Sequence, residues 1–350
     1  MTLIVFLSHG LFGASLFFCS CGVCWYLTNH PLVLDRPNHR SSHDMPVPIA
    51  GGIAIVATFL VGIVAVYLIA DRVMIEGSYF LGFVASSFLI SLVSLIDDLI
   101  TTRAFFRLSA QVLCVIAMMA FGIVMREFTF PWIGKIELGV LGYILTLFWI
   151  VGMANAYNFM DGINGIAAGT AVIVCIFFSY ICFIQGSIFT YIIGYTIAAG
   201  SLGFLLFNFP KAKLFMGDVG ATFLGFVFAT ISIIAANFDS SHTSLFVMPL
   251  LLFHFIYDTL FTFIRRLLNG EHVFQAHRSH LYQLFNRLGY SQTVVSCFYF
   301  GMGIAQGIGS LWMVNIPGNN RVLVFIPYLI VQVVYSAIII KKARKAGLLD

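Results

Sequence analysis

Residues 138–184 read LGVLGYILTLFWIVGMANAYNFMDGINGIAAGTAVIVCIFFSYICFI, and this stretch decides the fold of the chain. Two apolar runs, 138–157 and 166–184, flank a short polar loop that carries glycines and a single carboxylate, Asp161. Each run has about the 20 residues that a helix needs to cross the hydrocarbon core of a bilayer. The stretch therefore predicts two membrane-crossing helices joined by a polar loop.

The composition of the whole chain agrees with this local pattern. Of 350 residues, 60% are apolar and only 9% are charged. Polar side chains this scarce cannot cover the surface of a soluble globular domain. The apolar runs are continuous and do not alternate, which excludes a transmembrane β-barrel. We therefore predict an all-α, polytopic integral membrane protein that forms one transmembrane domain, residues 1–350.

Eleven apolar runs are candidate membrane spans: 3–27, 48–70, 79–96, 105–125, 138–157, 166–184, 187–207, 219–236, 244–264, 292–313 and 322–340. The first run has neither a basic leading segment nor a small-residue cleavage site, so we expect it to be retained as a helix. The seven cysteines all fall inside these spans. We interpret them as packing residues and not as a disulfide framework.

Basic residues divide unevenly between the two sides of these spans. All but four of the 18 Lys and Arg residues, Arg36 and Arg40 among them, lie in or beside the gaps that follow the odd-numbered spans. The four exceptions are Arg72, Arg126, Lys135 and Arg321. By the positive-inside rule the richer side is cytoplasmic, which places the N-terminus outside and the C-terminus in the cytoplasm. No basic domain lies outside the membrane, so we expect no nucleic-acid partner.

Four carboxylates fall on the side that is predicted to be cytoplasmic. Asp97 and Asp98 end the third span, Asp161 lies in the quoted loop, and Asp218 opens the eighth span. Ionisable residues at a span are candidate functional residues, but plainer interpretations stay open. Asp97 and Asp98 can mark the interface, although adjacent acids at a helix C-terminus oppose its dipole and repel each other. Asp161 and Asp218 can be N-caps of spans 6 and 8.

Glycines near two of these acids favour a binding site. They are Gly162, Gly165 and Gly169 after Asp161, and Gly217 and Gly220 beside Asp218. Glycine permits close approach of a ligand, and loops that open onto helix N-termini present N–H groups to an anion. Hard carboxylate oxygens without a nearby cysteine favour Mg²⁺, with Mn²⁺ as the alternative, bound together with a phosphate.

The longest gap on this side contains EHVFQAHRSHLYQLFNR, residues 271–287. The His277-x-x-His280 spacing is compatible with zinc. Arg278 between the histidines, and the absence of cysteine, favour anion binding instead. An ordinary basic loop at the lipid headgroups is the third interpretation.

The span before this loop contains an ionisable pair, His254 and Asp258, one helical turn apart. Ionisable residues within a span are functional by default. Asp258 is also two turns from Arg265, and we favour the structural role in which it holds this arginine.

Five motifs, taken in order, resemble one family. They are DRPNHRSSHDMPVPIAGGIAI (35–55), IDDLITTR (96–103), NFMDGINGIAAG (158–169), FNFPKAKLFMGDVGAT (207–222) and AHRSHLYQ (276–283). Together they resemble the polyprenyl-phosphate N-acetylhexosamine-1-phosphate transferases of glycosyltransferase family 4. This family includes undecaprenyl-phosphate GlcNAc-1-phosphate transferase and phospho-MurNAc-pentapeptide translocase. The loop around 276–283 is most similar to the branch that initiates O-antigen chains.

The resemblance implies an activity. Members transfer a sugar 1-phosphate from a UDP-sugar to a lipid phosphate at the cytoplasmic face, with Mg²⁺, and release UMP. For this chain it implies a UDP-N-acetylhexosamine donor, 6-deoxy in the O-antigen branch, and undecaprenyl phosphate as acceptor. It also implies a multi-pass protein of the bacterial inner membrane, and it allows a homodimer.

The motifs and the resemblance together give a set of candidate site residues. The catalytic candidates are Asp97, Asp98, Asp161, Arg278 and His280, the metal ligands are Asp218 and Asp98, and the nucleotide-binding candidates are Asn158, Asp161, Asn164, Asn208 and Phe215. Some positions depart from the family pattern. Asn164 stands where many members have Asp, Ala221 replaces a common Ser, His277 replaces an acid, and Tyr282-Gln283 replace histidines. Sugar specificity therefore does not carry over.

The expected chemistry begins with charge repulsion between the lipid phosphate and the diphosphate. We expect a cation held by Asp218 and Asp98 to offset it, with Arg278 and His280 at the phosphates. A phosphate monoester has a second pKa of about 6, so the lipid oxygen can attack without a base. We therefore favour Asp97 as a positioning residue in a one-step displacement over Asp97 as a proton acceptor. A phospho-aspartyl route through Asp97 or Asp98 is the alternative.

A secondary transporter or channel is the main rival function. It predicts carboxylates near the bilayer midplane and paired sequence repeats. The acids of this chain lie at one interface instead, and we find no repeat. A non-catalytic scaffold would not need the acids.

Overall fold

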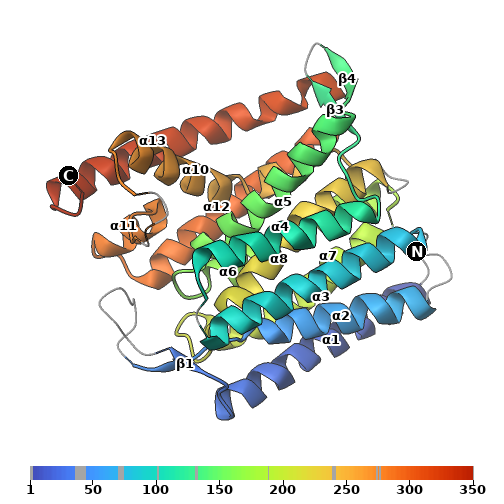
Figure 1. The fold of residues 1–350 in the computed structure, drawn as a ribbon, viewed down its shortest axis with the longest axis horizontal. Helices are drawn as coiled ribbons and strands as arrows, with labels where there is room; N and C mark the ends of the chain where they lie inside the picture. The colour runs from blue at the N-terminus through green and yellow to red at the C-terminus, as the bar shows by residue number, and fades with distance from the viewer. Residues whose placement is uncertain are drawn as a thin grey trace.

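The structure is a computed structural model that describes residues 3–35, 45–69, 75–100, 102–130, 133–187, 189–238, 242–272, 275 and 277–349. Arg36, Arg40 and Arg72, which entered the orientation argument, lie outside these residues. Long helices lie side by side in one bundle (Figure 1). In chain order the elements are α1 (Leu3–Asn29), β1 (Leu34–Asp35), β2 (Val47–Pro48), α2 (Gly52–Ile69), α3 (Gly77–Ile100), α4 (Ala104–Ala120), β3 (Glu127–Phe130), β4 (Gly134–Glu137), α5 (Val140–Met160), α6 (Ile166–Ile184), α7 (Phe189–Asn208), α8 (Gly217–Asn237), α9 (Val247–Leu251), α10 (Phe253–Leu268), α11 (Leu281–Arg287), α12 (Gln292–Met313), η1 (Gly318–Val324) and α13 (Phe325–Lys345).

Nine helices in the described part of the chain are long and apolar enough to cross a membrane. They are α1, α2, α3, α5, α6, α7, α8, α12 and α13, the last together with residues of η1. The prediction of a helical, polytopic membrane protein is confirmed, but the count of eleven spans is not. All seven cysteines are free, and four of them, Cys24, Cys114, Cys175 and Cys182, are buried as the expected packing role requires, whereas Cys19 and Cys297 are exposed.

The two remaining predicted spans are short or interrupted. The run 105–125 forms α4, which has only 17 residues. The run 244–264 is divided at Leu252 into α9 and α10. Four buried polar residues form a stripe along α10 at four-residue spacing: His254, Asp258, Thr262 and Arg266. Because this spacing puts them on one helix face, α10 turns its polar side toward the protein interior.

Two short antiparallel ribbons, absent from the all-α prediction, lie in the connections. β1 pairs with β2, and Leu34 lies opposite Pro48. β3 pairs with β4, and Glu127 lies opposite Glu137. In Figure 1 the β3–β4 ribbon lies at the end of the molecule remote from α11.

Helix α8 forms the centre of the bundle. In its most apolar window of 18 residues, 94% of the residues are buried, against 22% for α1 and 28% for α13. Helices α2, α3 and α5 pack around α8. Gly52 of α2 faces Gly220 of α8, and a Cβ on Gly52 would overlap the backbone of Gly220. This close approach holds the beginning of α8 against the beginning of α2.

Several helix ends meet beside the start of α8. Asp98, near the end of α3, bonds the first turn of α8, and Asn158, near the end of α5, bonds Asp218. Helix α11 joins them, because the Tyr282 hydroxyl donates to the carbonyl oxygen of Phe159 at 2.9 Å. The candidate residues thus gather at the end of the bundle where α11 and the C-terminus lie (Figure 1, left).

Candidate active site

Asp98 caps helix α8 from a different helix. Its two carboxylate oxygens accept hydrogen bonds from the backbone N–H groups of Asp218 (2.8 Å) and Val219 (3.0 Å). Gly217 has a φ of +75°, and a Cβ there would lie 2.6 Å from Asp98 Oδ2, so only glycine fits. The Asp98 charge lies at the positive end of the α8 dipole. The interpretation of Asp218 as N-cap was therefore wrong, because α8 takes its cap from α3.

Asp97 faces the connection between α3 and α4. One of its oxygens accepts from the backbone N–H (2.6 Å) and the hydroxyl (2.5 Å) of Thr102. The other oxygen accepts from Arg107 Nη1 at 2.9 Å. The adjacent acids Asp97 and Asp98 are thus compensated by different partners, which explains how two carboxylates can end one helix.

Arg107 links two of the acids. Its Nη1 donates to Asp97 Oδ2 at 2.9 Å and to Asp218 Oδ2 at 2.8 Å. Sequence reasoning counted Arg107 only as a charge that indicates orientation, and it missed this role. The available signal was its place in the first turn of the helix that follows the acid pair. One cationic nitrogen therefore lies between carboxylates of α3 and α8.

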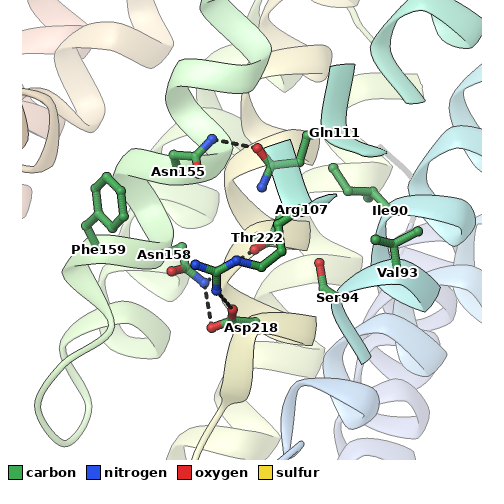
Figure 2. Close-up of a pocket in the computed structure, with 10 residues that line it drawn as sticks. All are labelled: Ile90, Val93, Ser94, Arg107, Gln111, Asn155, Asn158, Phe159, Asp218 and Thr222. Carbon is green, nitrogen blue, oxygen red and sulfur yellow. Dashed lines mark hydrogen bonds and ion pairs between the residues drawn. The ribbon is translucent and has the colours of Figure 1, made fainter. Parts of the chain in front are cut away.

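Asp218 borders a small polar pocket (Figure 2). Its Oδ1 accepts from Asn158 Nδ2 at 2.9 Å, and the same amide approaches Thr222 Oγ1 at 3.3 Å. The pocket volume is about 20 Å³, which is enough for roughly one water molecule. The pocket is thus too small for a nucleotide. Asn158 was predicted to contact the nucleotide, and the structure places it against the Asp218 carboxylate.

Asp161 follows the last residue of α5 and is its C-cap, while α6 begins after Gly165. The interpretation of Asp161 as the N-cap of span 6 was therefore wrong. Within the described residues its carboxylate has no hydrogen-bond partner. Burial raises the pKa of Asp161 to about 7, and the charges of Asp218 and Asp98 act in the same direction. Asp161 is thus an uncompensated acid close to the other carboxylates.

Two asparagines fix the loop after Asp161 by hydrogen bonds: Asn208 at the end of α7, and Asn164 within the loop itself. Asn208 is buried, accepts from the backbone N–H of Gly165 at 2.7 Å, and donates to the Leu214 carbonyl at 3.0 Å. Asn164 donates to the Pro210 carbonyl at 3.3 Å. These contacts give both residues a structural part in shaping the loop.

Phe215, a further nucleotide-binding candidate, is partly buried in the segment that leads into α8. Its backbone N–H donates to the Pro48 carbonyl at 2.8 Å, and its carbonyl accepts from Gly51 at 2.8 Å. The segment before α8 is therefore fixed against the entrance to α2. Nucleotide contacts of Phe215, Asn164 and Asn208 stay predictions.

His280 is held by a buried carboxylate. Asp258 Oδ1 lies 3.2 Å from His280 Nδ1, and the Asp258 carboxylate also accepts from the backbone N–H groups of Leu281 (2.9 Å) and Tyr282 (3.1 Å) and from the Tyr299 hydroxyl (2.7 Å). The expected pairing of Asp258 with Arg265 was wrong. Arg265 donates to the Ser279 carbonyl at 3.0 Å, and Asp258 anchors His280 and the start of α11.

The second histidine of this loop stacks on the first. The rings of His277 and His280 are 4.9 Å apart between centroids, and His280 lies 6.0 Å from the ring of Phe159, which lines the Asp218 pocket. Burial lowers the pKa of His277 to about 4, and His280 and the nearby arginines add to this effect. His277 is therefore neutral at pH 7, and its Nδ1 accepts from the Ser279 hydroxyl at 3.1 Å.

Within the part of the chain that the structure describes, the Arg278 side chain is free of polar partners, and the histidines beside it do not form a metal site. The Arg278 guanidinium makes no hydrogen bond or ion pair with a described residue, so it is available to an anion. Across the described chain, no group of three or more His, Cys, Asp or Glu residues is placed to hold a metal ion. The zinc interpretation of His277 and His280 therefore gains no support.

Comparison with known proteins identifies the family. Residues 80–236 match the family described as glycosyl transferase family 4. A Thermotoga maritima protein named undecaprenyl-phosphate alpha-N-acetylglucosaminyl 1-phosphate transferase is 30% identical over 259 residues, which are 73% of each chain. The chain belongs to glycosyl transferase family 4. The matched segment runs from α3 to α8 and includes every candidate residue described above except those of the His280 loop.

Two further relatives of this family 4 chain carry related names. A Bacillus subtilis protein named as a probable undecaprenyl-phosphate N-acetylglucosaminyl 1-phosphate transferase is 29% identical over 279 residues, 79% of this chain and 76% of the relative. A Staphylococcus saprophyticus phospho-N-acetylmuramoyl-pentapeptide-transferase is 32% identical over 182 residues, 51% of this chain and 54% of the relative. The family 4 chain is thus an enzyme of the sugar-1-phosphate transferase type.

The carboxylates of the family 4 chain suit a hard divalent cation. Asp97 and Asp218 together bind one cationic group, Arg107 Nη1, between their carboxylate oxygens. Mg²⁺ is usually bound by one or two carboxylates together with substrate phosphates and water, so this pair is sufficient. Both Asp98 oxygens already accept backbone N–H groups. Both oxygens of Asp97 are engaged as well, by Thr102 and Arg107, so the choice between Asp97 and the expected Asp98 as partner of Asp218 stays a prediction.

Proposed function

We propose that this enzyme transfers an N-acetylhexosamine 1-phosphate from a UDP-sugar to undecaprenyl phosphate and releases UMP. The proposal places the reaction at the cytoplasmic face of a bacterial inner membrane, where the product would begin a surface polysaccharide such as O-antigen. The observation that carries it is the convergence of Asp97, Asp218 and Arg107 at one end of a membrane-spanning bundle. The names of the family relatives support the substrate classes.

The arrangement of charges suits two anionic substrates. The side chain of Arg107 is 40% exposed, so guanidinium N–H groups beyond those on Asp97 and Asp218 can donate to a phosphate. Asp218 would hold Mg²⁺ together with Asp97, in the place of Arg107 Nη1, which would then turn to the diphosphate, or together with Asp98. The ion when bound supplies electrostatic stabilisation of the diphosphate. Arg278 and His280, held in place through Asp258, would bind the phosphates from the α11 side.

The transfer needs no general base. An oxygen of the lipid phosphate forms the new bond to the phosphorus that carries the sugar, and the bond to the UMP oxygen breaks. The lipid phosphate is largely ionised at pH 7 because its second pKa is about 6. Asp97, whose oxygens accept hydrogen bonds from Thr102 and Arg107, holds Arg107 or the metal ion in position and is not needed as a proton acceptor. A phospho-aspartyl route would instead exchange labelled UMP into UDP-sugar without lipid, which we expect not to occur.

The decisive experiment is a transfer assay with the purified full chain. It combines radiolabelled UDP-N-acetylhexosamines, undecaprenyl phosphate and Mg²⁺, and it measures label that enters the organic phase. We expect transfer that is abolished by EDTA and by Asp218→Ala. The control is Glu137→Ala, an exposed carboxylate on β4 at the opposite end, which leaves transfer unchanged. Full activity of Asp218→Ala would contradict the metal assignment, and no transfer with any donor would favour a transporter.

A further inference from the structure

A groove separate from the acidic site runs between α10 and α13. Its volume is about 640 Å³. Tyr257 and Phe261 of α10 form one wall, and Val333, Ala337 and Ile340 of α13 form the other. None of these residues belongs to the segment that matches the family. Apolar and aromatic side chains thus form both walls of the groove.

The aromatic wall of the groove is held in place by ring stacking and by a hydrogen bond. The rings of Tyr257 and Phe261 stack with 5.7 Å between centroids and an interplanar angle of 11°. The Tyr257 hydroxyl lies 3.0 Å from Ser336 Oγ on the opposite helix. The polar end of the tyrosine is therefore satisfied within the protein, and its flat apolar face lines the groove.

One end of the groove is strongly cationic. Lys341, Arg344 and Lys345 line it, and all three are exposed. Within the described chain none of them has an acidic partner. The neighbouring Lys342 differs, because its Nζ lies 3.4 Å from the Tyr290 hydroxyl and 5.8 Å from the centre of that ring, outside the groove. Three positive charges without an acidic partner among the described residues thus lie at one end of the apolar groove.

We propose that this groove binds one anionic glycerophospholipid, with an acyl chain along Tyr257 and Phe261 and the phosphate at Lys341, Arg344 and Lys345. Charge complementarity selects the headgroup, because basic pockets between transmembrane helices bind anionic headgroups. A zwitterionic lipid would leave the cations uncompensated. A soluble anion would leave the aromatic wall exposed. The site is independent of the transfer reaction.

The test is native mass spectrometry of the purified full chain in detergent. The probes are phosphatidylglycerol and phosphatidylcholine with identical acyl chains. We expect phosphatidylglycerol to be retained preferentially, and Arg344→Ala or Lys341→Ala to weaken its binding about fivefold each. Lys342→Ala is the matched control, since it removes the same charge from the same helix end but outside the groove. We expect it to leave binding unchanged.

A second variant tests the apolar half of the groove. Ala337→Phe fills part of the groove without a change of charge, and we expect it to weaken phosphatidylglycerol binding as well. The exposed charge variants keep the test valid if Ala337→Phe does not fold. Equal retention of both lipids, or equal losses in Arg344→Ala and Lys342→Ala, overturns the proposal. Displacement of phosphatidylglycerol by equimolar undecaprenyl phosphate would also overturn it, because the occupant would then be the acceptor.

Discussion

Arg107 shows how much one side chain can determine at this site. Arg107, on α4, donates to both Asp97 and Asp218 and offsets their charges. It is 10 residues from Asp97 in the sequence and 111 residues from Asp218. Without it, two carboxylates would face each other in a partly buried space. The same guanidinium is therefore expected to affect both the folding of the site and the binding of phosphate.

Arg107→Ala should lower kcat by about 10²–10³-fold, the usual cost of a lost donor to developing charge. Arg107→Lys should restore part of the rate, because it keeps the charge but loses the planar fork. The measurement is the radiolabel transfer assay. Arg103→Ala removes a similar exposed charge one turn earlier and is the control. Equal rates for Arg107→Ala and Arg103→Ala would remove Arg107 from the mechanism.

The carboxyl group of Asp161 makes the stability of the protein depend on pH. Its folded-state pKa of about 7 lies above the ordinary carboxyl value of about 4. Between these two values the unfolded chain loses the proton while the folded chain keeps it, so stability falls as pH rises through this window and stays reduced above it.

We therefore expect the metal-free protein to lose thermal stability between pH 4 and 7 through Asp161, and Asp161→Asn to remove this part of the loss. The measurement is the melting temperature in EDTA at each pH, for wild type and variant side by side. A constant difference between the two proteins across this range would show that Asp161 does not titrate there.

At the scale of elements, α10 and α11 act as one unit. Asp258 lies on the polar stripe of α10 and accepts hydrogen bonds from the first two residues of α11, so that one carboxylate caps a helix and orients His280. A capping carboxylate in a buried setting is worth more than an exposed cap, because its partners cannot turn to water. The position of α11 relative to the acidic site therefore depends on Asp258.

Asp258→Asn should reduce transfer by on the order of tenfold to a hundredfold, as for other groups that orient an active-site histidine. The amide keeps the size of the side chain but presents N–H groups toward backbone donors. Thr262→Val is the control, since it removes only one weaker donor to Asp258 at 3.2 Å. Rates are compared at equal amounts of folded protein from gel filtration. A variant Asp258→Asn with wild-type rate would limit Asp258 to packing.

At the scale of the whole molecule, the bundle has two chemically different ends. The acidic site, α11 and the basic end of α13 lie at one end, and the β3–β4 ribbon lies at the other (Figure 1). The orientation of this bundle in the membrane rests on the distribution of Lys and Arg and stays a prediction.

Single cysteines can test the orientation. We expect Lys135→Cys on β4 to react with a membrane-impermeant maleimide in intact cells, and Gln275→Cys near α11 to react only after permeabilisation. Both variants need a background without Cys19 and Cys297, the exposed native cysteines. The reverse pattern of labelling would place the acidic site outside the cytoplasm and would exclude a cytosolic donor.

Sequence by itself determined the membrane class, most of the spans, and the gathering of Asp97, Asp98, Asp161 and Asp218 at one end. It could do so because lipid requires continuous apolar helices, and helix parity then decides the side on which each connection lies. Only the tertiary structure decided that Asp98 caps α8 across 120 residues, that Arg107 joins Asp97 to Asp218, and that Asp258 holds His280 and not Arg265. These contacts depend on which helix ends meet and at what rotation, and that is set by close packing such as that of Gly52 against Gly220, which leaves no local pattern in the chain.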